Sequence, residues 1–552
     1  MRSRMPALAL AAVTFGLAGC GTPAAPGAAL ESFTTDGLTA HIAVLASDSF
    51  AGRGPASIGE ERTMAYLTEQ VGGLGLLPGN HGSWYQEVPL VRITSGSDAA
   101  LAIRGQGAQA RFQYGTDFVA NSKHLDNAVT VADADVMFVG YGVVAPEYGW
   151  NDYEGLDVRG KTVLILVNDP GFATGDTTLF RGRAMTYYGR WTYKYEEASR
   201  QGAAAAFVIH ETEPAAYGWN VVQSSWTGPQ FSLAAADGNR ARVSVEGWVT
   251  LETAQAMLRL AGQEYETLKT RAAARGFRGI PLGMTASVTL RQQVERSTSR
   301  NFVARLPGTD QADEHIIYMA HWDHFGTDPT REGDQIFNGA EDNATGTAGL
   351  IAMAKAFTAL SSPPSRSILF LAVTAEEQGL LGSAFYGGQP VVPLEQTVAA
   401  INMDGMNVLG PMRDVIVIGL GMSELDDYMT AAAAGQNRVV RPDAEPEKGY
   451  YYRSDHFSLA RHGVPALNPG AGQDHVEHGI EWTRQREAEY RAERYHQPSD
   501  EMLDSWDLSG MVQDLQLLFT IGYRLATSRD FPNWREGTEF KAQRDAMMLG
   551  TN

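Results

Sequence analysis

The stretch "HIIYMAHWDHFGTD", residues 315–328, decides the fold, because a buried strand and a cluster of metal-type side chains meet in it. The apolar run at its start is typical of a short buried strand. Two histidines and two aspartates follow within eight positions. His321 and Asp323 could be a metal ligand and its orienting carboxylate, or they could belong to a polar turn after a strand.

Two further apolar runs, "SILFLAV" at 367–373 and "TVAAINM" at 397–403, have the character of central strands covered on both faces. Between them and the first strand, "ATGTAGLIAMAKAFTAL" at 344–360 has apolar residues at helical spacing. This alternation predicts an α/β fold in which helices sandwich a sheet. A β-hairpin is expected at 286–308, and a late amphipathic helix at 511–525.

Acidic or imidazole side chains follow each of these three strands, and one more carboxylate stands at the start of the helix. Because ligands gather at the carboxyl ends of strands in open α/β sheets, we expect these groups to converge. Singly, each could be a helix cap, a strand end, a turn residue or a core histidine. Together, without cysteine, they suit Zn²⁺ or a similar ion in a catalytic site, and the crowding of carboxylates argues for two metals. The group comprises His321, Asp323, Asp342, Glu376, Glu377 and Asp404.

Length and composition describe a globular protein of more than one domain. The chain has 552 residues, which is too long for one ordinary core. Its formal net charge of −20 argues against nucleic acid as a partner, because binding a phosphate backbone needs clustered Lys and Arg. Strand-like segments at 136–144, 162–168 and 203–210 contain no metal-type cluster, so they suggest a separate module.

The N-terminus reads as an export signal. Two arginines precede an apolar run too short to span a bilayer, and "LAGC" ends at Cys20, the only cysteine. This motif resembles the bacterial lipobox, in which the cysteine is lipidated. We therefore expect a signal peptide at 1–20, a flexible tether at 21–30, and a lipid-anchored periplasmic or outer-membrane protein. The alternative is a soluble secreted protein.

The motif "HxD…EDNATG…EE…MDG…YH" resembles the dizinc exopeptidases that include bacterial leucyl aminopeptidase, aminopeptidase Y and glutamate carboxypeptidase II. The resemblance covers roughly 31–527. It implies a zinc exopeptidase with a phosphorylase/hydrolase-like fold and a mixed sheet, built from residues 31–130 and 284–527. Residues 131–283 resemble an inserted, β-rich protease-associated domain. A polar C-terminal tail follows at 528–552.

The resemblance also implies the role of each site residue. Asp342 would bridge two Zn²⁺ ions and be followed by a cis peptide. One metal would be completed by His321 and Asp404, and the other by Glu377 and His496. The remaining two roles are a general base, Glu376, and an acceptor that holds the His321 tautomer, Asp323.

The implied activity is that of an aminopeptidase, acting on peptides with a free N-terminus through a hydroxide that bridges the metals. A carboxypeptidase of the same family is an alternative and would need a basic pocket, to which Arg413, Arg441 or Arg453 could contribute. Glutaminyl cyclase, an acyltransferase, and a binding protein that has lost its metals are further alternatives. The substrate-lining candidates are His456 and Tyr451, the latter within an aromatic run that could equally be packing. The oligomeric state cannot be read from the sequence.

Overall fold

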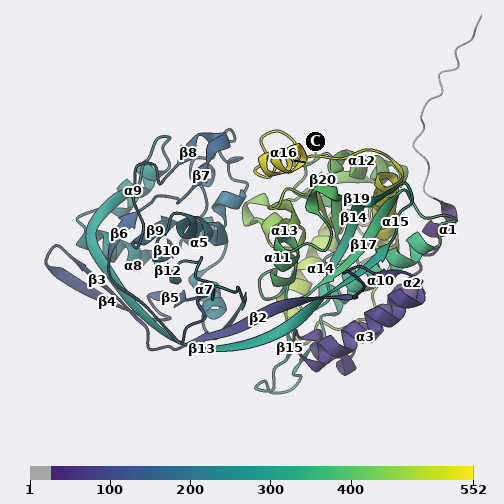
Figure 1. The fold of residues 1–552 in the computed structure, drawn as a ribbon, viewed down its shortest axis with the longest axis horizontal. Coiled ribbons are helices and arrows are strands. Elements are labelled where there is room, and N and C mark those ends of the chain that lie inside the picture. Colours follow the sequence, from purple (N-terminus) through teal and green to yellow (C-terminus); the bar gives the residue numbers. More distant parts are fainter. Residues whose placement is uncertain (1–25, 551–552) are drawn as a thin grey trace, which may run out of the picture.

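The computed structural model describes residues 26–550, which form two bodies joined by long strands (Figure 1). The larger body carries the strands that flank the metal-type residues, and the smaller one is an insert in the chain. The expected signal peptide, Cys20 and the first half of the expected tether lie outside the described residues. Within residues 26–550, no helix is long and apolar enough to cross a membrane.

A mixed sheet forms the centre of the larger body, with β14 (Gln311–His321) in its middle. β14 is parallel to β17 (Arg366–Val373) on one side and to β18 (Thr397–Asn402) on the other. β21 (Ala466–Gly470) extends the sheet in parallel beyond β18, while β13 (Ile280–Leu306) runs antiparallel to β17. The expected mixed sheet sandwiched by helices is therefore confirmed.

Strict alternation along these strands supplies the two faces of the sheet. Ile316, Tyr318 and Ala320 of β14 lie in one hydrophobic cluster, whereas Ile317 and Met319 lie in another. Most helical residues of the first cluster come from α2 (Thr35–Leu45), α3 (Ile58–Gly73), α10 (Thr345–Thr358) and α15 (Ser509–Thr527), and α12 (Leu425–Gly435) adds three more. The second contains residues of α11 (Leu381–Gly388) and α13 (His456–Ala460). Because both faces are covered, the central strands are continuously apolar.

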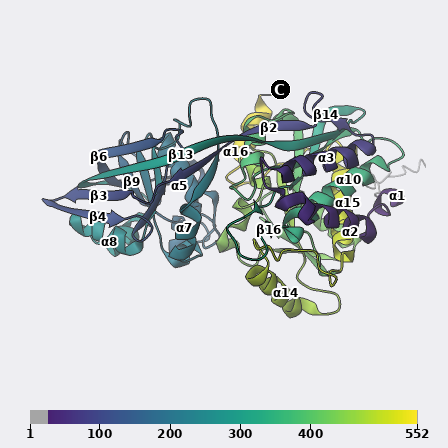
Figure 2. The same ribbon diagram turned by 90° about the horizontal axis from the view of Figure 1, so that it is seen from below.

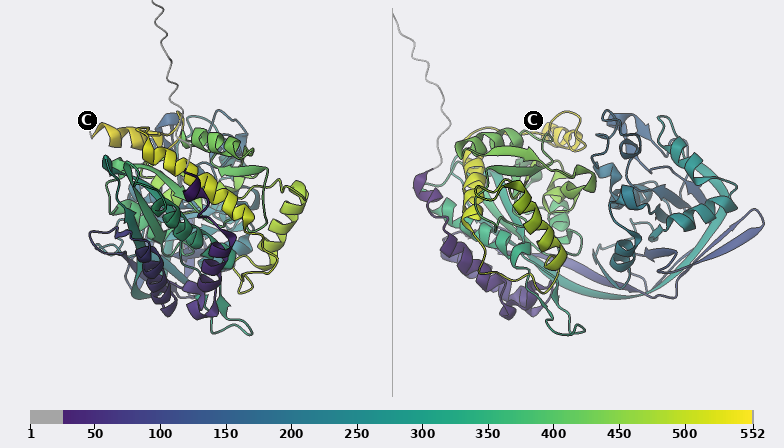
Figure 3. Two further views of the ribbon diagram at one scale, coloured as in Figure 1. Left: turned by 90° about the vertical axis from the view of Figure 1, so that its right-hand side faces the viewer. Right: turned by 180° about the vertical axis from the view of Figure 1, so that it is seen from behind.

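One strand belongs to both bodies. The hairpin expected at 286–308 does not form, because β13 runs unbroken from Ile280 to Leu306. Its first half pairs with β3 (Ala100–Gly105) and β6 (Ala128–Phe138) of the insert, and its second half with β2 (Tyr85–Ser95) and β17. Figures 2 and 3 show β2 and β13 spanning the two bodies.

The insert has its own sheet and core. Parallel strands β9 (Thr162–Leu166), β10 (Ala205–Ile209) and β12 (Val245–Val249) form its centre. Its hydrophobic cluster begins at Ala99 and includes Leu101, Ile103 and Phe112. The expected boundary at residue 131 is therefore too late, because β3, β4 (Ala108–Gln113) and β5 (Phe118–Asn121) already pack in the insert.

Both expected peripheral segments are partly packed. Gly27–Leu30, assigned to the tether, form helix α1, and Ala29 is buried in the main core. The expected polar tail contains helix α16 (Lys541–Leu549) and two buried aromatic side chains. Trp534 donates a hydrogen bond from Nε1 to the Gly463 carbonyl (2.9 Å), and Phe540 packs in the same cluster as α13. Scattered single apolar residues gave no periodic signal that would predict this packing.

Candidate metal centre

The carboxyl ends of the three parallel strands bring the predicted residues together. His321 is the last residue of β14, the two glutamates follow β17, and Asp404 follows β18. Asp342 lies in a distorted helical turn, η4 (Ala340–Ala344), that leads into α10. The Asp342–Asn343 peptide is cis, as the resemblance implied.

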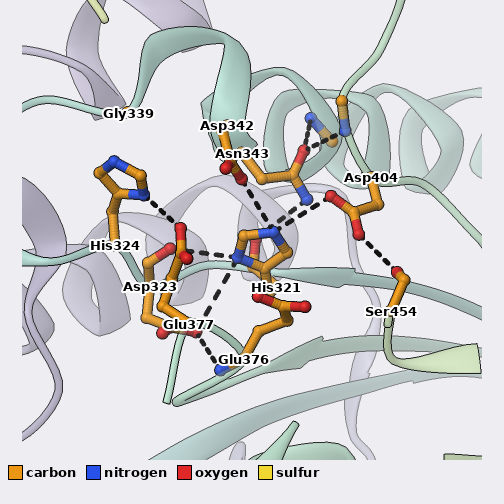
Figure 4. Close-up of polar contacts among 12 residues, drawn as sticks. His321, Asp323, His324, Gly339, Asp342, Asn343, Glu376, Glu377, Asp404 and Ser454 are labelled. Carbon is orange, nitrogen blue, oxygen red and sulfur yellow. Dashed lines mark hydrogen bonds and ion pairs between the residues drawn. The ribbon is translucent and has the colours of Figure 1, made fainter. Parts of the chain in front are cut away.

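Two sets of ligand atoms share the Asp342 carboxylate. His321 Nε2 lies 3.2 Å from Asp342 Oδ1 and 3.2 Å from Asp404 Oδ1. His496 Nε2 lies 3.2 Å from Asp342 Oδ2 and 3.2 Å from Glu377 Oε2. Each oxygen of one carboxylate thus faces a histidine that also faces a second carboxylate. All five predicted ligands converge, and Figure 4 shows four of them.

The spacing and chemistry of these atoms fit zinc. Tetrahedral zinc with bonds of about 2.0–2.1 Å separates its ligand atoms by about 3.3 Å, which is close to the separations in both sets. Two imidazoles and three carboxylates without a thiolate are donors typical of catalytic zinc. Single ligand atoms from His321, Asp342 and Glu377 also lie within 4.8 Å of one another. The donor atoms present therefore fit zinc, with one Asp342 oxygen facing each histidine.

The pKa shifts of two carboxyl groups also indicate that the site binds cations. Burial, followed by the nearby carboxylates, raises the pKa of Glu377 well above its usual range. Burial also raises the pKa of Glu376 well above its usual range, and the Asp404 carboxylate adds to this shift. Ionised carboxylates at this density need cations beside them. Bound zinc would supply those cations.

Asp323 orients His321 differently from the expectation. The Asp323 backbone carbonyl lies 3.2 Å from His321 Nδ1, whereas the nearest carboxylate oxygen lies 4.0 Å away. The carboxylate instead accepts a hydrogen bond from the Glu376 backbone N–H (3.1 Å). The carbonyl is therefore the acceptor that fixes the tautomer, and the side chain holds the loop that bears the expected base.

His324, the last histidine of the opening stretch, is a site residue that sequence reasoning missed. His324 Nδ1 lies 2.5 Å from Glu377 Oε1, and the imidazole is fully buried (Figure 4). Burial lowers the pKa of His324 to about 3, so the neutral ring can donate to the Glu377 carboxylate. Its position three residues after His321 was the available signal.

A buried arginine far away in the sequence joins the loops around the site. The Arg53 guanidinium donates to the backbone carbonyls of Trp322 (2.9 Å), Asn338 (2.6 Å) and Gly339 (2.7 Å). It therefore ties the loop after β14 to the loop before Asp342. No feature of the "FAGRG" segment predicts this role from sequence.

Polar side chains fix the other ligands in the same way. The Asp500 carboxylate accepts from the Asp342 backbone N–H (3.1 Å), and Tyr490 OH donates to it (3.3 Å). Ser454 Oγ donates to Asp404 Oδ2, and Asn402 Nδ2 donates to Ser454 Oγ (2.7 Å). Such partners hold metal ligands in place before a metal binds.

The two candidate substrate residues are buried in the larger body, and the Asp404 charge acts on His456. His456 is fully buried, and its ring lies edge-on to Tyr451 with centroids 4.6 Å apart. Tyr451 is buried in the hydrophobic cluster beneath α13. Both rings thus pack inside the larger body, and their role toward substrate stays a prediction.

Comparison with known proteins identifies relatives of the segment that carries these residues. Residues 301–520 match the family model of peptidase family M28. The aminopeptidase NAALADL1 of Mus musculus is 32% identical over 129 residues, which are 22% of this chain and 16% of that protein. A probable zinc metalloprotease of Pyricularia oryzae is 36% identical over 109 residues, 19% of each chain. The chain thus matches less than a fifth of the length of these relatives, and the similarity to peptidase family M28 is that of residues 301–520.

A solved structure shows the same fold over most of the chain. An aminopeptidase from Aneurinibacillus sp. strain AM-1 superposes with a TM-score of 0.50 at 19% sequence identity. The superposition covers 91% of this chain and 97% of the other. The α/β fold with its large mixed sheet is therefore shared.

Proposed function

We propose that this protein is a zinc-dependent metallo-exopeptidase, and specifically an aminopeptidase. The observation that carries the proposal is the sharing of Asp342 between two ligand sets, one completed by His321 and Asp404 and the other by Glu377 and His496. Both sets are complete, which argues against a cyclase with one zinc or a binding protein without metal. The match to peptidase family M28 supports the same reaction class.

Zinc bound here would supply Lewis-acid activation of water and of the peptide carbonyl. The chain itself supplies the proton transfers. No hydrogen-bond partner within residues 26–550 occupies the Glu376 carboxylate, so it is available to take a proton from attacking water and return it to the departing amine. Asp323 holds the Glu376 backbone and thereby aims this carboxylate.

A free α-amine is the substrate feature that suits the site. Glu376 and Asp404 are carboxylates at its rim, and the Asp404 side chain remains 24% exposed. An ammonium group placed beside them gains a favourable charge interaction. The acidic rim therefore favours cleavage at the N-terminus of a peptide.

A pair of chromogenic substrates tests this proposal. Zinc-loaded protein should release p-nitroaniline from leucine p-nitroanilide and leave N-acetyl-leucine p-nitroanilide intact. Cleavage of N-blocked peptides alone would refute the aminopeptidase assignment. Failure on every peptide tested, with zinc bound, would refute the peptidase assignment itself.

A carboxypeptidase is the second candidate, and one observation favours it. Of the three arginines considered from sequence, Arg413 is paired with Asp474 and Arg441 with Asp414. Arg453 forms no ion pair among the described residues, and only its contact with the Tyr450 ring is present. It directly precedes Ser454, which donates to Asp404.

A second unpaired guanidinium comes from the insert. Arg190 Nε is buried without a hydrogen-bond partner among the described residues. Burial lowers the pKa of Arg190 to about 10, and the charge of Arg453 adds to the effect. Two like charges brought together from two bodies would be stabilised by an anion between them. A substrate carboxylate is such an anion.

Peptides that differ only at the C-terminus separate the two candidates. A carboxypeptidase would cleave an N-acetyl dipeptide with a free carboxylate and reject its amide, and Arg453→Gln would abolish the preference. Arg441→Gln is the matched control, because that guanidinium is already paired with Asp414. Equal rates on both peptides would exclude a carboxylate requirement.

We further propose that the insert is the protease-associated domain suggested by the sequence and that it restricts access to the site. Its segment around Tyr187 contacts the larger body close to Arg453, with the Tyr187 and Phe457 ring centroids 4.9 Å apart. Arg461 Nη2 lies 2.9 Å from Glu196 Oε2 across the same interface. These contacts support a role as a spacer that admits short peptides.

A further inference from the structure

The insert contains a cavity of about 790 Å³, within the size range of small-molecule sites. It lies beyond the carboxyl ends of β9, β10 and β12, since three residues of its lining, Val167, His210 and Thr250, directly follow those strands. This is the position at which open α/β sheets bind ligands. The peptidase residues belong to a different sheet, so the cavity is separate from the metal centre.

Aromatic side chains line part of the cavity. Tyr141 and Phe172 are buried within its lining, and the Trp219 indole lies edge-on to the His210 ring, with centroids 5.7 Å apart. His210 Nε2 lies 2.9 Å from the Tyr217 carbonyl. Burial lowers the pKa of His210, so its ring is neutral at pH 7. The histidine therefore adds no positive charge to the wall.

Carboxylates exceed cations in the lining. Lys269 Nζ lies 2.5 Å from Glu211 Oε2, and Arg183 Nη2 lies 2.8 Å from Glu213 Oε1. Each of the two cations is thus neutralised by a glutamate of the same wall. Two further carboxylates line the cavity without a basic partner in residues 26–550: Asp117, which accepts a hydrogen bond from the Gln113 backbone N–H (2.8 Å), and Glu252, which is exposed.

We propose that this cavity binds a cationic side chain of a peptide, that is, a lysine ammonium or an arginine guanidinium. Asp117 and Glu252 would pair with the charge, and Trp219 would offer an aromatic face to it. An anion is disfavoured because both cations already have partners. A purely apolar ligand would desolvate both carboxylates and offer no opposite charge to them.

The proposal does not depend on the peptidase reaction. The loop that lines the cavity also reaches toward the larger body, since Tyr217 lies within the electrostatic range of Arg190 and Arg453. Only this loop would therefore separate a peptide bound in the cavity from the interface between the two bodies. The site would act as an anchor for basic peptides.

Isothermal titration of the zinc-loaded protein with N-acetyl-arginine amide tests the proposal. This probe has no free amine and no carboxylate, so it lacks both groups by which an exopeptidase site holds a terminus. The neutral isostere N-acetyl-citrulline amide is the ligand control. We expect saturable binding of the arginine probe and binding of the citrulline probe that is weaker by about tenfold.

The variant pair Asp117→Asn and Glu252→Gln should together weaken the arginine probe by about tenfold while leaving leucine p-nitroanilide turnover unchanged. Asp135→Asn, which removes one exposed carboxylate elsewhere in the insert, should leave binding unchanged. Equal binding of both probes, no saturation, or binding that survives the double variant would overturn the proposal. If neither the wild type nor any of these variants turns over leucine p-nitroanilide, the peptidase function is refuted and the proposal for the cavity is not.

Discussion

The Glu376 carboxylate has no hydrogen-bond partner in residues 26–550, while Asp323 accepts a hydrogen bond from the Glu376 backbone N–H. We predict that Glu376→Gln lowers turnover of leucine p-nitroanilide by about 10²- to 10⁴-fold, since the amide cannot take up the proton. Zinc content should stay at the wild-type value. Glu332→Gln, on an exposed loop, is the control and should keep full activity. Wild-type turnover of Glu376→Gln would remove this residue from the mechanism.

His324 acts on the metal centre through Glu377. We predict that His324→Ala weakens zinc binding by about 10- to 100-fold, as is usual when a partner of a metal ligand is lost. The measurement is a competition titration against a zinc chelator. His81→Gln, at an exposed position, should bind zinc like the wild type. Unchanged affinity in His324→Ala would show that Glu377 is held in place without it.

At the scale of residues, the sequence predicted the ligands and missed most of their supports. Four of the five ligands follow apolar strands or begin a helix, and that placement is visible in the sequence. His496 lies in the loop after α14 (Gly479–Glu493), and only the resemblance of its segment to the family motif pointed to it. Arg53 and Asp500 act on backbone groups that are distant in sequence, so no local pattern marks them. The sequence correctly paired Asp323 with His321 but named the carboxylate as the acceptor. The acceptor is the Asp323 backbone carbonyl, and the sequence does not distinguish between these two groups.

At the scale of elements, the loop that precedes η4 requires a glycine at position 339. Gly339 has φ of +54°, and a Cβ there would lie 2.3 Å from the Asp342 carbonyl oxygen and 2.6 Å from the His324 ring. Gly333 also has a positive φ of +80° but open space around it. Comparing alanine substitutions at the two positions therefore separates the cost of backbone strain from the cost of a steric clash.

We predict that Gly333→Ala costs about 1–2 kcal/mol of unfolding free energy, from strain alone. Gly339→Ala should cost at least about 1 kcal/mol more, because overpacking is added, and it should also weaken zinc binding. Urea unfolding and zinc titration of both variants provide the comparison. Equal stability losses with equal zinc affinity would contradict the packing described around Asp342.

The central elements were predictable because burial on both faces leaves a clear signal. β14, β17, β18 and α10 all form where continuous or helical apolar patterns predict them. β13 was misread as a hairpin because polar residues near its middle, "RQQVERSTSR", resemble a turn. Much of this segment is exposed where the strand passes between the bodies, so polarity marks solvent there and not a break in the strand.

Considering the whole molecule, polar and aromatic contacts around Tyr187 and Glu196 hold the insert against the larger body. Arg461 donates two hydrogen bonds to the Glu196 carboxylate, at 3.1 and 2.9 Å, and Tyr187 OH also donates to it. We predict that Glu196→Gln increases amide hydrogen exchange around residues 185–191 by loosening this contact. Glu213→Gln removes an exposed ion pair within the insert and should leave that exchange unchanged. Identical exchange in both variants would mean that β2 and β13 alone set the arrangement.

The division into two bodies was predictable from length and from strands without metal-type residues, but the boundary was not. The strands between Ala100 and Asn121 alternate like those of any sheet, so their pairing with β13 or β12 can be read only from the fold. The packing of the C-terminal segment was also not predictable from the sequence, because isolated aromatic residues such as Trp534 do not form a periodic hydrophobic pattern.

Zinc content, measured together with the anomalous scattering of zinc in a crystal, tests the central claim most directly. Two zinc ions per chain should lie on either side of the Asp342 carboxylate, one beside His321 and Asp404 and the other beside Glu377 and His496. Asp342→Ala should reduce the content below two, because both ions lose a shared ligand. A single ion, or zinc bound away from these five side chains, would contradict the account.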